Sequence, residues 1–191
     1  MTIRDREIPA YSIVALGGLW LLWSLHVAAR KIRTWDEAAT QAIQVATIDW
    51  PWWLVCAPSR LGDGWLYAAV VLWLRYTGRR AEAGHIAACV LVAWGGSALL
   101  KIITRRQRPR TGRVPLAWWR EVHSSFPSQH AACVWAFGVA FALEYPHMPM
   151  TGTVLGFVCS AVAISRVAIG AHYLGDVLAG VALGVAAGVW G

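Results

Sequence analysis

Charged side chains are scarce in this chain, and hydrophobic ones are abundant. Asp, Glu, Lys and Arg make up 14% of the 191 residues, hydrophobic types make up 58%, and the mean hydropathy is +0.49. A soluble domain of this length with such a composition would expose too much apolar surface. The composition therefore predicts an integral membrane protein, and the length favours a single membrane-embedded domain over residues 1–191.

Acidic residues are scarcer still, with 10 Asp and Glu against 17 Lys and Arg, which gives a formal net charge of +7. Such a basic excess can indicate nucleic-acid binding. The arginines, however, cluster in short loops between apolar stretches, which argues against a nucleic-acid partner. The bilayer is the expected environment, and nothing in the sequence implies an obligate protein partner.

Cysteine is rare, and its four copies are far apart in the chain. Three of them lie inside apolar stretches, and none has the spacing of metal ligands. We therefore expect small core residues rather than disulfides or a metal site. They are Cys56, Cys89, Cys133 and Cys159.

Six apolar stretches predict an all-α membrane protein with about six transmembrane helices. Their length and their Ala, Leu and Val content favour helices over barrel strands. The first is too long for the apolar region of a cleaved signal peptide, so we interpret it as a retained helix. Several others are shorter than the ~20 residues of a full crossing, so their polar ends must reach the interface. The stretches lie near residues 10–29, 62–76, 84–104, 127–144, 150–165 and 173–190.

Two long connections, residues 30–61 and 105–126, are expected on the same side of the membrane. Both contain tryptophans, which anchor at headgroup depth and can also contact lipid chains. The positive-inside rule does not decide the orientation once the cations of the motifs below are set aside. The tryptophans are Trp50, Trp52, Trp53, Trp118 and Trp119.

The first polar motif is a Lys–Arg pair at the end of the third apolar stretch. Lys101 and Arg108 are seven residues apart, which predicts that they face the same direction on two helical turns. Pro109 then ends the helix because it lacks an N–H group. The alternative is a pair of cations that snorkel at a helix end.

The second motif opens the fourth apolar stretch with Pro127, Ser128, Gln129 and His130. Proline suits the first helical turn, and a helix N-terminus with free N–H groups binds phosphate readily. Ser128 can add a hydroxyl group, and His130 lies one residue beyond Gln129. The alternative is an ordinary helix cap with a structural histidine.

The third motif places a histidine and an aspartate one helical turn apart, at the start of the last stretch. The Asp176 carboxylate could accept the Nδ1–H of His172 and leave Nε2 free as a nucleophile. An aspartate inside a membrane span is costly unless it is partnered, so a functional role is favoured over a structural pair. Gly180, Gly184 and Gly188 continue the same face and allow other helices to approach closely.

Together these motifs resemble the type 2 phosphatidic acid phosphatase family, whose membrane members are lipid phosphatases and whose soluble relatives include vanadium haloperoxidases. The family pattern is Lys-x6-Arg-Pro, then Pro-Ser-Gly-His, then Ser-Arg-x5-His-x3-Asp. The chain departs from it at Gln129, where the family has glycine. Glutamine would be strained there if the backbone needs positive φ, but not as the second residue of a helix, which Pro127 favours. The other matching residues include Lys101, Arg108, Pro109, Ser165, Arg166, His172 and Asp176.

The resemblance implies a role for each matching residue. His172 would attack phosphorus to give a phosphohistidine, with Asp176 orienting its ring. His130 would protonate the leaving group and then activate water. Because fixed cations can neutralise the developing charge, no metal or other cofactor is expected. The phosphate-binding residues would be Lys101, Arg108, Ser128, Gln129 and Arg166.

The expected function is therefore a metal-independent phosphatase for an amphiphilic phosphate, with its active site on the outer side of the bacterial inner membrane. Candidate substrates are undecaprenyl pyrophosphate, phosphatidylglycerol phosphate, phosphatidic acid and the phosphates of lipid A. A lipid-to-lipid phosphotransferase would use the same residues. A non-catalytic lipid-phosphate binder would not need His130, His172 and Asp176. Additional arginines could suit a diphosphate or bind anionic lipid non-specifically; they are Arg105, Arg106, Arg110 and Arg113.

Overall fold

The computed structural model describes residues 31–109 and 124–190. The predicted first span and several residues singled out above lie outside these ranges, namely residues 10–29, Arg110, Arg113, Trp118 and Trp119. The described chain is helical, and it contains no strand, which confirms the all-α fold class. Residues from Ala39 onward form one compact unit, to which the following paragraphs refer.

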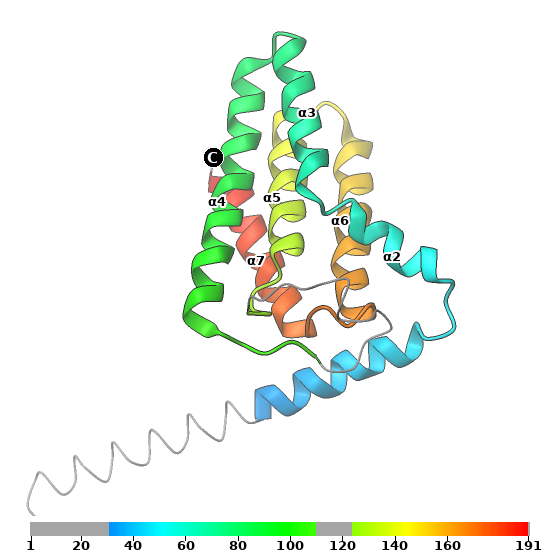
Figure 1. The fold of residues 1–191 in the computed structure, drawn as a ribbon. Coiled ribbons are helices and arrows are strands. Elements are labelled where there is room, and N and C mark those ends of the chain that lie inside the picture. The colour runs from blue at the N-terminus through cyan, green and yellow to red at the C-terminus, as the bar shows by residue number, and fades with distance from the viewer. Residues whose placement is uncertain (1–30, 110–123, 191) are drawn as a thin grey trace, which may run out of the picture. The chain divides into compact units, whose positions relative to one another are not determined.

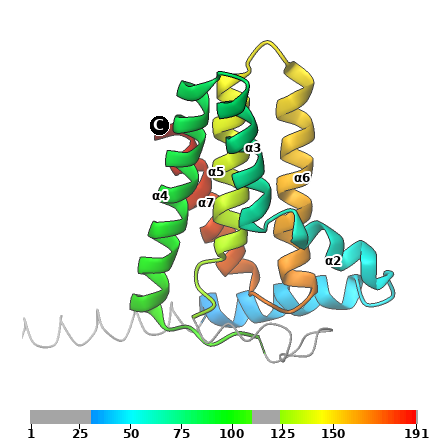
Figure 2. The same cartoon turned by 45° about the horizontal axis from the view of Figure 1, so that its top comes forward.

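Five helices stand side by side as a bundle with α5 in the middle (Figures 1 and 2). Helix α5 packs against α4, α6 and α7, whereas α3 packs against α4. These helices match five of the predicted apolar stretches to within a few residues. Their bounds are Gly64–Tyr76 for α3, Arg80–Thr104 for α4, Gln129–Glu144 for α5, Pro149–Ala168 for α6 and Leu174–Trp190 for α7.

The connection predicted over residues 30–61 is wrong, because two helices lie within it. One covers residues 31–46, and the other is α2, Trp52–Arg60. Helix α2 has only nine residues, so its hydropathy does not stand out from its surroundings. It is held by packing against α6, where Val55 and Cys56 join a buried apolar cluster.

Two of the described helices, α4 and α6, are long and apolar enough to cross a membrane. Helix α7 is apolar but shorter, and α3 has 13 residues. The number of six spans therefore stays a prediction. Large apolar side chains point outward along α4, among them Leu91, Leu99 and Ile103. Such an exposed apolar surface is typical of a helix that faces lipid.

The glycines of α7 allow it to lie directly against α5, which confirms the predicted close approach of another helix to this face. A Cβ atom at Gly180 would come within 2.4 Å of the Ser128 carbonyl oxygen, and one at Gly184 within 2.3 Å of the Ala132 carbonyl oxygen. The backbone N–H of Ser128 also donates to the Asp176 carbonyl oxygen at 2.9 Å. This contact brings the second and third motifs together at one end of the bundle.

The four cysteines are buried and free of disulfides, as predicted. They belong to the apolar contacts between helices, as Cys133 and Cys159 do in the cluster between α3, α4, α5 and α6.

Candidate active site

The first motif does not lie on one helical face, so the predicted geometry of the Lys–Arg pair is wrong. Helix α4 ends at Thr104, and Arg105 takes a left-handed conformation with φ 46° and ψ 33°. The chain then leaves the helix axis before it reaches Arg108. Lys101 stays on α4, where its Nζ atom donates to the Ser124 carbonyl oxygen at 2.8 Å.

Arg108 nevertheless reaches the third motif by this different route. Its Nη1 atom donates to the Ala171 carbonyl oxygen at 2.7 Å and lies 3.4 Å from Nε2 of His172. The Nε atom of Arg108 is buried and has no hydrogen-bond partner among the described residues, so this N–H can donate to an anion. The first and third motifs are therefore joined at His172.

His172 is almost completely buried, and a backbone carbonyl group holds its ring. The Nδ1 atom lies 2.7 Å from the carbonyl oxygen of Ser125. Since a carbonyl oxygen only accepts hydrogen bonds, Nδ1 carries the proton, and the unprotonated Nε2 of the neutral ring faces the Arg108 donor. The tautomer is the one that the sequence predicted, but a different group fixes it.

Asp176 was expected to accept the Nδ1–H of His172, and this expectation is wrong. Its Oδ2 atom lies 3.8 Å from Nδ1, beyond hydrogen-bond distance, and accepts the backbone N–H of Tyr173 at 3.0 Å. Its Oδ1 atom accepts a hydrogen bond from Nη1 of Arg106 at 2.7 Å. The Arg106 guanidinium in turn lies over the Tyr173 ring, 4.2 Å from its centroid. Asp176 thus acts on the His172 ring as a nearby buried charge.

The second motif begins its helix later than predicted. Ser128 is the N-cap and Gln129 the first helical residue, so Pro127 precedes the helix instead of starting it. The backbone of Gln129 has no positive φ, which confirms the unstrained alternative. The hydroxyl group of Ser128 is buried and has no hydrogen-bond partner among the described residues. A buried hydroxyl group of this kind is suited to donate to a bound phosphate.

The neighbouring motif residues Arg166 and Ser165 have different hydrogen-bond partners. Arg166 is fully buried on α6, and its Nη1 atom donates to the hydroxyl group of Ser59 on α2 at 2.7 Å. Ser165 donates to the Val162 carbonyl oxygen of its own helix at 2.7 Å. Ser59 therefore positions Arg166 from another helix, whereas the Ser165 hydroxyl group is hydrogen-bonded within α6.

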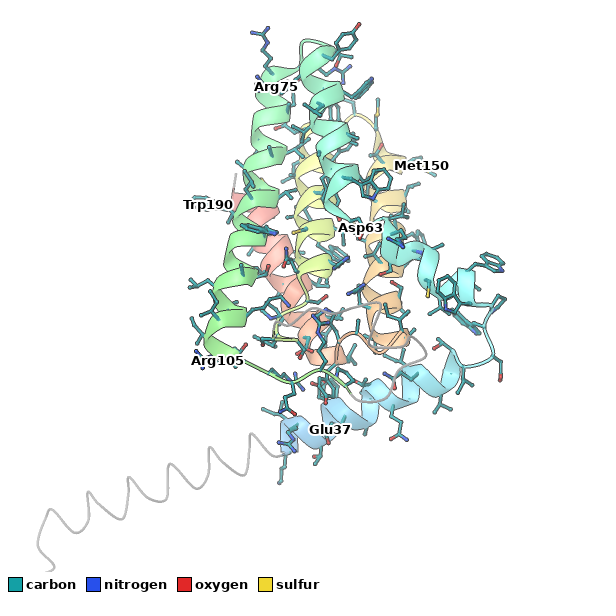
Figure 3. All side chains as sticks on the ribbon, viewed as in Figure 1. Glu37, Asp63, Arg75, Arg105, Met150 and Trp190 are labelled. Carbon is teal, nitrogen blue, oxygen red and sulfur yellow. The ribbon has the colours of Figure 1, made fainter. Side chains whose placement is uncertain are left out.

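Four residues of the site were not predicted in these roles: Ser59, Asp63, Arg106 and Ser125. Asp63 lies 3.3 Å from Nε2 of His130, and in Figure 3 it stands where α2 meets α3. Arg106 was noted only as one cation in an arginine-rich run. Ser125 contacts His172 through its backbone carbonyl group, so the type of side chain gave no signal for this contact. A further pair, His85 with Glu144, joins α4 to α5 at the end of these helices away from the motifs.

A cavity of about 880 Å³ opens beside these motifs at the end of α4, where Figure 3 marks Arg105. Four cations line it, so it attracts anions. The cations are Lys101, Arg105, Arg106 and Arg108, and the other polar residues are Gln107, Ser124 and Gln129. Among residues 31–109 and 124–190, no group of three His, Cys, Asp or Glu side chains is arranged to hold a metal ion.

A second cavity, an apolar groove of about 530 Å³, adjoins the first between α3, α4 and α5. Tyr67, Val71 and Leu91 are among its apolar walls, and Asp63 and His130 lie in it as well. Trp94 and Gln129 line both cavities. The site therefore combines a cationic chamber with an apolar groove.

Residues 82–191 match the family described as the PAP2 superfamily. The chain belongs to this superfamily. It is 33% identical to decaprenylphosphoryl-5-phosphoribose phosphatase of Mycobacterium tuberculosis, over 80% of this chain and 86% of that protein. It is 26% identical to phosphatidylglycerophosphatase B of Bacillus subtilis, over 92% of this chain and 90% of the relative.

Two crystal structures of this superfamily's fold are similar to the chain. The transmembrane PAP2-type phosphatidylglycerolphosphate phosphatase of Bacillus subtilis has a TM-score of 0.65 at 22% identity, covering 93% of this chain and 92% of that one. LpxE of Aquifex aeolicus has a TM-score of 0.63 at 16% identity, covering 78% of this chain and 92% of that one.

These comparisons confirm the family resemblance drawn from the three motifs. They also confirm the predicted enzyme class, a lipid phosphate phosphatase of the membrane, because the relatives are phosphatases acting on lipid phosphates. The roles of individual residues, the phosphohistidine and the independence from metal stay predictions.

Proposed function

We propose that this PAP2 protein removes a terminal phosphate from an amphiphilic lipid through a phosphohistidine on His172. The observation that carries the proposal is the geometry of the His172 ring. Its Nδ1 atom donates to the Ser125 carbonyl oxygen, and its Nε2 atom lies beside the Arg108 guanidinium. This arrangement offers an unprotonated nitrogen next to a cation that binds phosphate, as nucleophilic attack on phosphorus requires.

In the first step, Nε2 of His172 forms a bond to phosphorus while the bond from phosphorus to the leaving oxygen breaks. The ring becomes positively charged, and the Ser125 carbonyl oxygen and the Asp176 carboxylate stabilise that charge. The phosphoryl oxygens are held by cations and hydrogen-bond donors, so no metal ion is needed. These residues are Lys101, Arg108, Ser128, Gln129 through its backbone N–H, and Arg166.

His130 acts as the general acid in the first step and as the general base in the second. Its imidazolium form protonates the leaving oxygen, and its neutral form then removes a proton from the water that attacks the phosphohistidine. Its position in the apolar groove supports this role, because the lipid portion of the substrate would occupy that groove and leave from it.

For the substrate, we propose a phosphomonoester carried on a polar unit of a lipid, rather than a pyrophosphate. The names of two relatives place the phosphate on a ribose or a glycerol unit. The cationic chamber is larger than a phosphate alone requires, and Gln107, Ser124 and Gln129 offer it uncharged hydrogen-bonding groups. The neighbouring groove suits the hydrocarbon chain.

We place the active site on the outer side of the bacterial inner membrane, as the family resemblance implies. Asp49 is exposed in the connection between residues 31–46 and α2, on the side predicted for the motifs. An Asp49→Cys variant should react with a membrane-impermeant maleimide in intact spheroplasts, whereas the native cysteines are buried. Labelling only after the membrane is opened would show instead that this side of the protein faces the cytoplasm.

The main experiment measures inorganic phosphate released by the detergent-purified protein, with and without EDTA, beside His172→Ala. The substrates are phosphatidic acid, phosphatidylglycerol phosphate, a lipid A phosphate, a polyprenyl-linked phosphosugar and undecaprenyl pyrophosphate. We expect release that survives EDTA, is lost in the variant and is fastest with phosphomonoesters. A phosphate label on the protein that is stable in alkali, labile in acid and absent from His172→Ala would identify the intermediate.

Other outcomes would change the assignment in defined ways. Release that stops in EDTA would contradict the metal-independent mechanism. Fastest release from undecaprenyl pyrophosphate would contradict the preference for phosphomonoesters. Loss of substrate without free phosphate, in the presence of a second lipid, would indicate a phosphotransferase.

A further inference from the structure

His130 has a neighbour that the PAP2 motifs do not include. Its Nε2 atom lies 3.3 Å from Oδ1 of Asp63, which is 67 residues earlier in the chain, between α2 and α3. We propose that Asp63 is a positioning residue that holds His130 in its imidazolium form for departure of the leaving group. The proposal rests on the function proposed above and adds a second His–carboxylate pair to the site.

The Asp63 side chain does not cap α3, the helix that it precedes. Asp63 is the N-cap of α3, where an aspartate normally accepts hydrogen bonds from the first turn, but its side chain makes no capping bond. Its carboxylate lies instead on the wall of an apolar groove. Burying a carboxylate among apolar groups is costly unless a partner compensates for it. His130 supplies that partner, with Arg60 at 3.6 Å as a more exposed second one.

Gly62 provides an independent observation about the same ring. A Cβ atom at this position would lie 2.9 Å from Cδ2 of His130 and 3.1 Å from Cγ1 of Val162. Only glycine therefore allows the connection between α2 and α3 to approach the ring so closely. Gly62 and Asp63 thus both position the His130 ring. Gly62 packs against its Cδ2 edge, and Asp63 contacts its Nε2 atom.

Charged and titratable groups face the groove of His130 and the adjoining chamber from several helices. Arg60 comes from α2, Tyr67 and Cys133 line the groove from α3 and α5, and Lys101 lines the adjoining chamber from α4. Arg166 on α6, His172 in the connection between α6 and α7, and Asp176 on α7 belong to the proposed phosphate site. Against the cations, the Asp63 carboxylate supplies negative charge in direct contact with the ring, which favours the imidazolium.

The proton transfers follow from this pairing. In the imidazolium, Nε2–H donates to Asp63, and Nδ1–H gives its proton to the leaving oxygen as the phosphorus–oxygen bond breaks. The neutral ring keeps its proton on Nε2, so Nδ1 can accept a proton from the water that attacks the phosphohistidine. The hydroxide equivalent bonds to phosphorus, the bond to His172 breaks, and His130 returns to its charged form.

Asp63→Asn tests this role through the dependence on the leaving group. The value of kcat/KM reports only the steps up to departure of the leaving group, and a general acid matters most when that group is a poor one. A positioned general acid contributes about 10²–10⁴-fold. We therefore expect at least about a tenfold loss with the best lipid phosphomonoester. With p-nitrophenyl phosphate, whose phenolate leaves without a proton, the loss should stay within about threefold.

Asp49→Asn is the matched control, because Asp49 is an exposed aspartate that lines neither cavity. Asp63→Glu keeps the carboxylate and should recover part of the activity towards the lipid. In a His130→Ala background, Asp63→Asn should cause no further loss. Equal losses with both substrates, or a full additional loss in that background, would overturn the proposal.

A second pair of variants tests the contact with the ring. Gly62→Ala forces a carbon atom against His130, whereas Gly84→Ala, away from both cavities, adds one where no atom lies within 4 Å. Gly62→Ala should selectively lower activity towards the lipid substrate, and Gly84→Ala should not. If the wild type releases no phosphate from either substrate, the proposed function fails. An active wild type with an unaffected Asp63→Asn refutes only the role of Asp63.

Discussion

The contact between α5 and α7 should control both stability and catalysis, and Gly180→Ala tests it most directly. The new methyl group would lie 2.4 Å from the Ser128 carbonyl oxygen and 3.1 Å from Cβ of Ala131. Real Cβ contacts essentially never fall below 3.0 Å, so the helices must separate there by about 0.6 Å. The atom in conflict belongs to the backbone, so no side-chain rotation can relieve it.

Two effects of this substitution oppose each other. Alanine in place of glycine favours a helix by about 1 kcal/mol, whereas overpacking costs about 1–3 kcal/mol. We therefore expect a net loss of up to about 2 kcal/mol. The same separation also moves Ser128 and His130, at the start of α5, away from His172, which lies just before α7. Since a displacement of about 1 Å can cost about 100-fold in rate, kcat should fall roughly tenfold or more.

The assay combines thermal denaturation in detergent with kcat for phosphate release from the best lipid substrate. Gly156→Ala is the control, because it makes the same change on α6 where no atom lies within 4 Å. That variant should be as stable as the wild type or slightly more so, with unchanged kcat. If Gly180→Ala matched Gly156→Ala in both measurements, the close packing of α5 and α7 described here would be refuted.

Three further substitutions have defined expectations. Arg106→Gln removes the cation bound to the buried Asp176 carboxylate and should destabilise the protein by about 3 kcal/mol, measured by denaturation in detergent; the exposed Arg75→Gln should not. Arg105→Gly relieves a left-handed conformation and should keep or raise stability by up to about 1 kcal/mol, whereas Arg105→Val should lower it. Trp94→Ala, at the junction of the two cavities, should raise KM for a long-chain lipid phosphate roughly tenfold and leave a short-chain analogue little changed. An equal change in KM for both substrates would exclude a role for Trp94 in binding the chain.

Several features of this protein could be predicted from local patterns in the sequence. Apolar stretches predicted α3 to α7, because helix formation and hydropathy depend on neighbouring residues. The spacing of three glycines predicted that another helix lies close to this face of α7, and the structure shows that helix to be α5. The motif residues were recognisable for the same reason, since each motif lies within one short segment.

The partners of these residues could not be read from such patterns. Ser59 holds Arg166 across 107 residues, Asp63 contacts His130 across 67, and Arg106 binds Asp176 across 70. The acceptor for Nδ1 of His172 is a backbone carbonyl group, which any residue at position 125 would supply. Side-chain type and spacing carry no information about such contacts.

The sequence by itself determined that this chain is helical, apolar and equipped with a lysine, arginines, histidines and an aspartate suited to a lipid phosphate. Only the tertiary structure decided how those groups meet. The left-handed turn at Arg105 sends Arg108 towards α7 instead of along α4. Packing of α2 against α6 brings Ser59 to Arg166. These arrangements depend on contacts between distant segments, and such contacts form only when the whole bundle packs.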